Sequence, residues 1–284
     1  MTIENRLTAG QVIERFRQMP EMRKLVEDCY YDEDLLYAAK RFYESEEFSA
    51  VKGYLDLSNT GKPGLLLDVG GGNGVASLAC RWAGWRPVLA DPDYSDVVGL
   101  GAIAPCLKQT GYDIGLCAAI GEALPFADNT FDVVYTRQVL HHVPDLQAMC
   151  GEVFRVLKPK GMYMATREHV ISKPRDLDIF LQNHPVHRLA GGENAHLLRE
   201  YRTALKRAGF RKIKVLGPWQ SVINYYPTTR SQYVDHCRAG LSRYFGPRIA
   251  RHLSSVGSVL KLAGWYATRA DRTPGRMYSF IAIR

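Results

Sequence analysis

The sequence predicts an α/β fold: a Rossmann-like, doubly wound sheet of seven mostly parallel strands, with helical N-terminal and C-terminal additions. Residues 65–80 read as an apolar strand, a glycine-rich turn and a helix. Further apolar segments then alternate with helical patterns, as in sheets that helices cover on both faces. The chain has 284 residues, of which 46% are hydrophobic, and this is enough for one such core plus substantial additions.

The first strand and its turn carry the clearest signal. Residues 65–69 have the length and apolarity of a buried parallel strand. Gly70, Gly72 and Gly74 follow at alternate positions, and glycines let backbone N–H groups approach a ligand closely. The G-x-G-x-G spacing, with Asp68 two residues ahead, differs from the dinucleotide and phosphate-loop motifs. It predicts a cradle for a small-molecule cofactor.

The other strands are expected at residues 87–90, 114–118, 131–135, 161–166, 211–216 and 277–283. Apolar residues at helical spacing predict a helix over 145–157, and 201–209 reads as a helix that a glycine ends. In a doubly wound sheet the ligand lies at the carboxyl ends of the strands. The residues that follow each strand are therefore the site candidates.

Three segments fall outside this minimal core. Residues 1–64 are helical in pattern and are expected to form an N-terminal cap on a domain of residues 65–284. Residues 172–196 form a loop-rich insert, and residues 219–275 separate the last two strands with a pattern that suggests helices. Inserts that follow strand ends often form lids or substrate walls. We expect the cap and the domain to form one structural unit.

Composition narrows the class of protein. No run approaches the roughly 18 apolar residues of a membrane span, and the N-terminus lacks the layout of a signal peptide. Six cysteines are scattered without a C-x-x-C pair, which favours reduced thiols over disulfides or a zinc site. A cytoplasmic protein is expected.

Charge is distributed unevenly along the chain. Residues 199–284 hold 17 Lys and Arg against three acids, whereas residues 1–64 hold 9 against 12. The basic part is either a solvated surface or a face toward an anionic substrate, nucleic acid or membrane surface. Nucleic acid is the less favoured partner, because the sequence contains no recognisable RNA-binding module or amino-methylation signature. Oligomeric state has no signature that we can interpret.

Asp91 and Pro92 follow the second predicted strand. A carboxylate at this strand end would lie beside the glycine turn and accept hydrogen bonds from a ribose diol, as acids do in other nucleoside-binding α/β folds. The alternative is a turn or helix-capping aspartate, which Pro92 and Asp93 also suit. The position directly after the strand favours the ribose.

The segment 121–161 adds LPF-x-D-x-x-FD-x-V, RQVLHHVPD and EVFRVLKPKG. Together with LLLDVGGGNG and ADPD, this ordered set closely resembles the class I S-adenosylmethionine-dependent methyltransferases, in particular the group that includes quinone-biosynthesis C-methyltransferases. The resemblance covers roughly residues 65–166. It implies that S-adenosylmethionine is the cofactor and lies across the strand ends.

The resemblance also implies roles for individual residues. Asp68 and the glycine turn would face the aminoacyl part of the cofactor, Asp91 and Pro92 its ribose, and Arg137 its methionine end. The adenine would lie against Ala119, Ile120 and Gly121. The family often has an aspartate at the position of Ile120 that hydrogen-bonds the adenine amino group, so packing and backbone groups would hold the ring here.

Methyl transfer to a hydroxyl requires removal of a proton, and histidine is the natural base near neutral pH. His169 at the end of the fifth strand is our preferred base, and the alternative is that it is an exposed loop histidine without a catalytic role. His141 is the second candidate, and the alternative is that it has a structural role. Arg167, Glu168, His187 and Arg188 are candidate acceptor contacts. Metal ligation by the His-rich insert is conceivable, but no regular ligand spacing supports it, so no metal is expected.

These features favour an S-adenosylmethionine-dependent methyltransferase that O-methylates a polar or anionic small molecule or glycan. C- or N-methylation of a quinone, lipid or natural product is the alternative that the core resemblance alone would permit. A non-catalytic cofactor-binding protein is the alternative of another class. The core motifs identify the methyl donor, while the identity of the acceptor depends on inserts without a readable signature.

Overall fold

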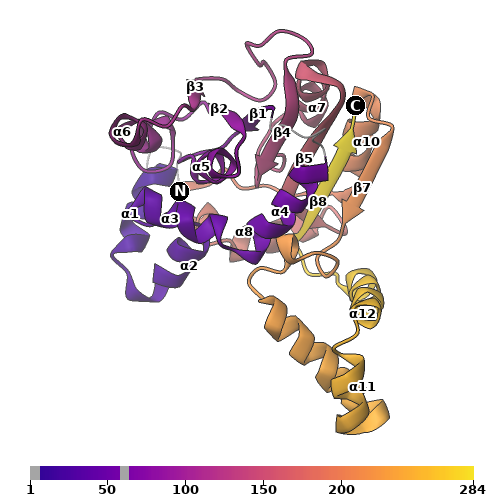
Figure 1. Cartoon of the computed structure of the whole chain (residues 1–284). Helices are drawn as coiled ribbons and strands as arrows, with labels where there is room; N and C mark the ends of the chain where they lie inside the picture. Colours follow the sequence, from indigo (N-terminus) through magenta and orange to yellow (C-terminus); the bar gives the residue numbers. More distant parts are fainter. Residues whose placement is uncertain (1–6, 58–63) are drawn as a thin grey trace.

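The computed structural model describes residues 7–57 and 64–284, and it is a mixed α/β structure built on one sheet (Figure 1). The strand order is β3-β2-β1-β4-β5-β8-β7, and the short β6 pairs with β5 outside this path. Strands β1 to β5 are parallel, and β8 runs antiparallel to both β5 and β7. The strands are β1 (Leu65–Val69), β2 (Arg86–Ala90), β3 (Gly115–Cys117), β4 (Phe131–Arg137), β5 (Leu157–Ile171), β6 (His196–Leu197), β7 (Lys212–Leu216) and β8 (Arg276–Ile283). The predicted fold class is confirmed, and the two-residue β6 is an addition to the seven expected strands.

Helices cover both faces of the sheet. The core helices are α5 (Val75–Trp82), α6 (Leu100–Thr110), α7 (Leu146–Val156) and α10 (Leu198–Ala208). Helix α7 begins where the Asp145 side chain accepts hydrogen bonds from the first-turn amides, and α10 ends at Gly209 in the left-handed conformation. The insert expected to be loop-rich contains two short helices, α8 (Asp176–Asn183) and α9 (His187–Ala190).

The N-terminal residues form α1 (Ala9–Arg17), a 3-10 turn at Pro20–Met22, α2 (Arg23–Asp28), α3 (Leu35–Tyr43) and α4 (Glu46–Leu57). These helices pack against the body of the fold: the ring of Tyr43 on α3 lies 5.7 Å from that of Trp82 on α5, centroid to centroid. Leu66 of β1 packs with α3 and α4 in one apolar cluster, while Leu67 joins α7 and α10 in the cluster on the other face. Burial on both faces explains why β1 reads as a continuous apolar run.

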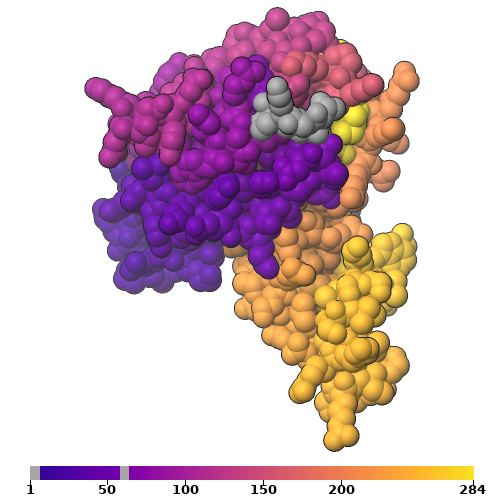
Figure 2. Space-filling view, viewed as in Figure 1, coloured from indigo at the N-terminus to yellow at the C-terminus, as the bar shows by residue number. Residues whose placement is uncertain are grey.

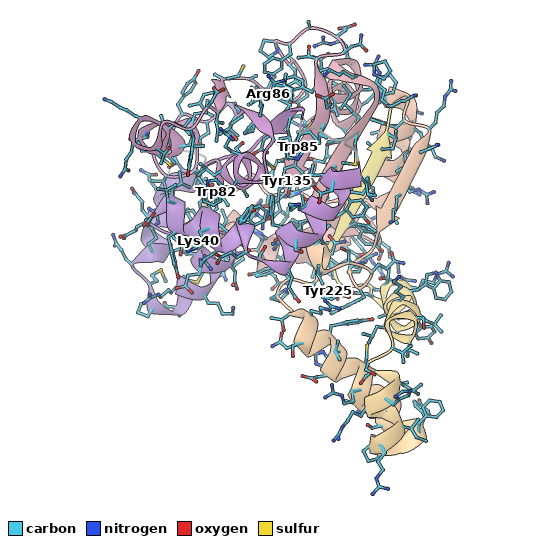
Figure 3. The ribbon with its side chains drawn as sticks, viewed as in Figure 1. Lys40, Trp82, Trp85, Arg86, Tyr135 and Tyr225 are labelled. Carbon is cyan, nitrogen blue, oxygen red and sulfur yellow. The ribbon has the colours of Figure 1, made fainter. Side chains whose placement is uncertain are left out.

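A helical arm leaves this body (Figure 1, Figure 2). It consists of α11 (Arg230–Leu253), which is interrupted at Gly246, and α12 (Gly257–Ala270), in agreement with the helical pattern expected between the last two strands. At the base of the arm, the Tyr225 ring packs against Tyr233 and Trp219 (Figure 3). Within residues 7–57 and 64–284, no helix is long and apolar enough to cross a membrane.

Strand β5 is longer than expected, and it contains a bulge. The predicted end was residue 166, but the strand continues to Ile171 because it pairs with both β8 and β6. The register against β8 shifts between Ala165 and Glu168, and Arg167 has a φ of 61°. His169 therefore lies inside a strand and is only 5% exposed, so the alternative of an exposed loop histidine is wrong.

A buried ion cluster ties the N-terminal helices to the strand ends. The carboxylate of Glu47 on α4 accepts hydrogen bonds from Arg137 Nε at 2.7 Å and from Arg167 Nη1 at 2.7 Å. Burial alone would raise the pKa of Glu47, but the charges of Arg137 and Arg167 outweigh it and hold the pKa below its usual value. The negative charge of Glu47 thus balances the positive charges of both Arg137 and Arg167.

We predict that Glu47→Gln lowers the free energy of unfolding by about 3–5 kcal/mol, because it leaves two buried guanidinium groups without a counter-charge. Urea unfolding at pH 7 measures this loss. Since the folded pKa of Glu47 is depressed, its contribution should be complete above about pH 4.5 and should be lost as the pH falls through the folded pKa. Glu46→Gln, one residue earlier and exposed, is the matched control and should change stability by less than about 0.5 kcal/mol. Equal effects of the two variants would contradict the role of the cluster.

Candidate functional site

The glycine turn joins β1 to α5 and touches the loop that follows β4. Gly70 has a φ of 66°, and a Cβ atom there would lie 2.8 Å from the Val139 side chain. Gly74 has a φ of 82°, and a Cβ atom would lie 2.2 Å from Ile103 of α6. Gly74 is thus required by packing against α6, whereas Gly70 allows the turn to meet the β4 loop. The predicted cofactor contacts of the three glycines stay predictions.

Asp91 directly follows β2 and is hydrogen-bonded to the glycine turn. Its Oδ2 accepts a hydrogen bond from the Gly72 amide at 2.9 Å, and its Oδ1 accepts one from the Asp93 amide at 2.8 Å. Burial raises the pKa of Asp91, and these two hydrogen bonds partly offset the rise. Each oxygen keeps a lone pair for a further donor, so the structural role and a ribose-binding role are compatible.

Asp68 lies in β1, two residues before Gly70 of the glycine turn. Ser77 donates its hydroxyl to Asp68 Oδ2 at 2.7 Å, while Oδ1 is buried and has no hydrogen-bond partner among the described residues. Burial raises the pKa of Asp68 to about 7. A buried carboxylate oxygen without a protein donor can accept a hydrogen bond from a ligand.

An apolar hollow of about 410 Å³ lies beside the end of β2. Its lining includes Pro92, Ala119 and the half-exposed Ile120, together with Ala118, Ala123 and Pro125. Gly121 faces away toward α7, since a Cβ atom there would meet Met149. The hollow offers contact surface and backbone groups for a planar ring, and its lining side chains carry no hydrogen-bonding group.

A histidine–glutamate cluster follows β4. Glu168 on β5 accepts hydrogen bonds from the amides of Val139 and His141 at 3.2 and 3.1 Å and lies 2.7 Å from His141 Nδ1. Burial opposes the charged imidazolium, but the hydrogen bonds and charges of Glu168 and Glu193 raise the pKa of His141 to about 9. His141 is therefore a cation at neutral pH.

His169 is the neutral member of this cluster. Its ring centroid lies 4.6 Å from that of His141, and its Nδ1 lies 2.7 Å from the Gly275 carbonyl oxygen. A carbonyl accepts, so Nδ1 carries the proton and Nε2 holds a lone pair. Burial and the nearby charge of His141 lower the pKa of His169 to about 3. Its Nε2 is buried and lacks a hydrogen-bond partner among the described residues.

Glu193, from the insert, completes the cluster. Its carboxylate lies 3.6 Å from His141 Nε2, 3.8 Å from His142 Nε2 and 3.8 Å from His184 Nδ1. Burial alone would raise the pKa of Glu193, but the three surrounding histidines lower it to about 2. The insert thus brings a carboxylate to the carboxyl ends of β4 and β5.

The other predicted site residues lie in different parts of the structure. Arg137 and Arg167 are bonded to Glu47, and Arg167 also lies over the Tyr226 ring, with its guanidinium carbon 4.8 Å from the ring centroid. His187 and Arg188 lie on α9, where Arg188 is exposed. Sequence reasoning missed Glu47, because its position within a helical pattern carries no signal for a contact 90 residues away.

Tyr31 was also missed. Its hydroxyl oxygen lies 3.8 Å from where a Gly72 Cβ would stand. Burial is the main reason that its pKa is raised, and the charges of both Asp91 and Glu193 act on it. Tyr31 therefore lies in the region that links the glycine turn to the histidine cluster.

Comparison with known proteins finds methyltransferases by both family model and sequence similarity. Residues 67–165 match the family model of a methyltransferase domain. An uncharacterised methyltransferase of Mycobacterium leprae is 36% identical over 128 residues, 43% of this chain and 45% of that protein. The sterol 24-C-methyltransferase of Schizosaccharomyces pombe is 34% identical over 118 residues, 37% of this chain and 30% of that protein. The chain spans less than half the length of these curated relatives.

Among solved structures, the Haemonchus contortus phosphoethanolamine N-methyltransferase 2 in complex with phosphomonomethylethanolamine and S-adenosylhomocysteine matches with a TM-score of 0.56. The match covers 98% of this chain and 60% of that chain at 14% identity. At this identity the likeness concerns the fold.

We predict that Asp68→Asn makes the protein more stable relative to wild type at pH 8 than at pH 4. The folded state keeps the Asp68 proton until about pH 7, whereas an unfolded aspartate loses it near pH 4. Ionising Asp68 therefore costs folding free energy as the pH rises between these values, and the cost remains above pH 7. The difference should be on the order of a few kcal/mol in urea unfolding. A difference between Asp68→Asn and wild type that does not change with pH would exclude a raised pKa at Asp68. Asp113→Asn, at an exposed aspartate, is the matched control.

Proposed function

The chain belongs to the class I S-adenosylmethionine-dependent methyltransferases, a family of enzymes, and from this premise we propose that it methylates a hydroxyl group of a polar or anionic small molecule or glycan. The observation that carries the proposal is the buried histidine–glutamate cluster beside the glycine turn. Methylation of a hydroxyl requires a group that takes its proton, and the cluster contains a neutral imidazole with an open nitrogen.

The residues at the strand ends fit the family's cofactor. Asp91 has lone pairs for the ribose, the hollow around Ile120 has the size for an adenine ring, and Asp68 Oδ1 is a buried acceptor without a donor. When bound, S-adenosylmethionine supplies an electrophilic methyl group. Arg137 is bonded to Glu47, so we propose that it lines the methionine end of the cofactor as a member of this ion pair.

The two histidines have different roles in this proposal. His141 is a cation at neutral pH and cannot accept a proton in that state. His169 Nε2 holds a lone pair, and the Gly275 carbonyl holds its ring in that tautomer. His169 thus receives the hydroxyl proton as the oxygen is methylated, because the oxygen then becomes acidic enough for a base with a pKa of about 3.

The acceptor side of the cluster is polar. Glu193, His142 and His184 surround it, and the predicted acceptor contacts His187 and Arg188 lie on α9 of the same insert. Such groups would pair with hydroxyl, carboxylate or phosphate groups rather than with an apolar ring system. Arg167 and Glu168 support the acceptor site from β5, since their side chains are bonded to Glu47 and His141.

We predict that calorimetric titration of the full chain with S-adenosylmethionine shows one site per chain. With radiolabelled donor and a panel of sugar, sugar phosphate and hydroxy-acid acceptors, the label should appear as an O-methyl ether. His169→Ala should lower turnover about 100-fold or more while changing the donor Kd by less than about threefold, because the lost group acts on the acceptor proton. His236→Ala, an exposed histidine on α11, is the matched control and should leave both unchanged.

Three outcomes would contradict the proposal. Absence of donor binding would favour a protein without methyltransferase chemistry. Transfer of the label to carbon or nitrogen would favour the C- or N-methylation alternative. Full activity of His169→Ala would remove its role as the proton acceptor.

A further inference from the structure

We infer that His141, His169 and Glu193 together bind a divalent first-row transition-metal cation. One ring nitrogen of each histidine and one carboxylate oxygen of Glu193 lie within 4.8 Å of one another. The side chains are almost fully buried, at 1% exposure for His141, 5% for His169 and 12% for Glu193. Two imidazoles and one carboxylate are the ligand set of open facial sites for such cations.

His169 Nε2 is the first observation that points to a ligand. The nitrogen is buried and has no hydrogen-bond partner among residues 7–57 and 64–284. Leaving a buried polar atom unpaired costs folding free energy, so proteins rarely keep one without a use. Because Nδ1 is held by the Gly275 carbonyl, the lone pair of Nε2 is the group that His169 offers to the cluster.

The surroundings of both imidazoles are those of metal-binding histidines. His141 Nδ1 lies 2.7 Å from Glu168, and His169 Nδ1 lies 2.7 Å from a backbone carbonyl. Ligating histidines almost always donate their second ring N–H to a carboxylate or carbonyl, which fixes the ring and its tautomer. Glu168 and the Gly275 carbonyl are thus positioning groups, and each leaves the Nε2 atom of its histidine available as a ligand.

The charge of the site suits a divalent cation. Glu168 and Glu193 bring two carboxylates to the buried region beside His141. His142 and His184 approach the Glu193 carboxylate from outside this set, each at 3.8 Å.

The ligand atoms need a small inward movement. A tetrahedral cation with bonds of about 2.1 Å holds its ligands about 3.4 Å apart, compared with up to 4.8 Å here. Glu193 lies in the insert between α9 and β6, where no strand or helix holds it, and it can make this approach most easily. The ligands come from three distant segments of the chain, which is why their spacing gave no metal signal in the sequence.

The inference rests on the proposed function only for what the cation would do. A bound cation would lower the pKa of an acceptor hydroxyl that coordinates to it. His169 would then hold the cation, and the hydroxyl proton would pass to water instead of to His169. Cation binding does not depend on the methyl donor. The two proposals can therefore fail separately.

The test uses the untagged full chain, freed of metal by a chelator and titrated with Co²⁺, whose visible absorption reports its ligands. We expect one Co²⁺ per chain, a rise in the unfolding temperature, and displacement by Zn²⁺ but not by an equal concentration of Ca²⁺, which prefers oxygen ligands. His169→Ala and Glu193→Gln should each weaken binding about 100-fold or more, and the positioning variant Glu168→Gln about 10- to 100-fold. His236→Ala is the matched control and should bind like wild type.

Circular dichroism of each metal-free variant establishes that it folds, and Glu193→Gln, which keeps the side-chain volume, gives the decisive comparison if His169→Ala does not fold. Absence of stoichiometric Co²⁺ binding, or binding that both His169→Ala and Glu193→Gln retain, would overturn the inference. If S-adenosylmethionine binds but Co²⁺ does not, the metal site is wrong and the methyltransferase proposal stands. If Co²⁺ binds at this cluster but the donor does not, the reverse holds.

Discussion

The site depends on one buried carboxylate, that of Glu168. It accepts hydrogen bonds from two amides of the loop after β4 and from the His141 ring, and it is fully buried. These bonds hold the loop in the shape that brings Val139 against Gly70 and His141 against His169. A buried carboxylate is costly unless several donors satisfy it, and Glu168 has them. The loop, the glycine turn and the histidines therefore form one connected arrangement.

The bulge in β5 makes this arrangement possible. With Arg167 in the left-handed region, the register against β8 shifts, and consecutive charged residues serve different neighbours. Arg167 reaches Glu47 on α4, while Glu168 reaches the loop after β4. Bulges commonly redirect side chains next to functional sites. Here the redirection also couples the N-terminal helices to the same strand end as the histidines.

The parts of the fold that depend on local sequence could be predicted. The strand β1, the turn at Gly70 and the acid at Asp91 are readable because strand length, glycine spacing and strand order specify them locally. The adenine contacts at Ala119, Ile120 and Gly121 were inferred from a motif within one loop, and an apolar hollow lies beside Ala119 and Ile120. Each of these features involves residues that are close in the sequence or adjacent in the sheet order.

Features that join distant segments could not be predicted. The pairing of Glu47 with Arg137 spans 90 residues, and the cluster of His141, His169 and Glu193 joins β4, β5 and the insert. The position of His169 depended on a bulge that hydrogen bonding to β8 and β6 creates, and neither composition nor periodicity reveals such a bulge. These contacts decide which histidine is charged, which is neutral and which nitrogen is open.

The central claim is that the glycine turn and the histidine cluster face each other as two halves of one site. A crystal structure of the full chain with S-adenosylhomocysteine tests this most directly. The account predicts the adenine in the hollow at Ile120, the ribose at Asp91 and the sulfur atom directed toward His141 and His169. A sulfur atom directed elsewhere, or separated from the two histidines by side chains of the N-terminal helices, would contradict it.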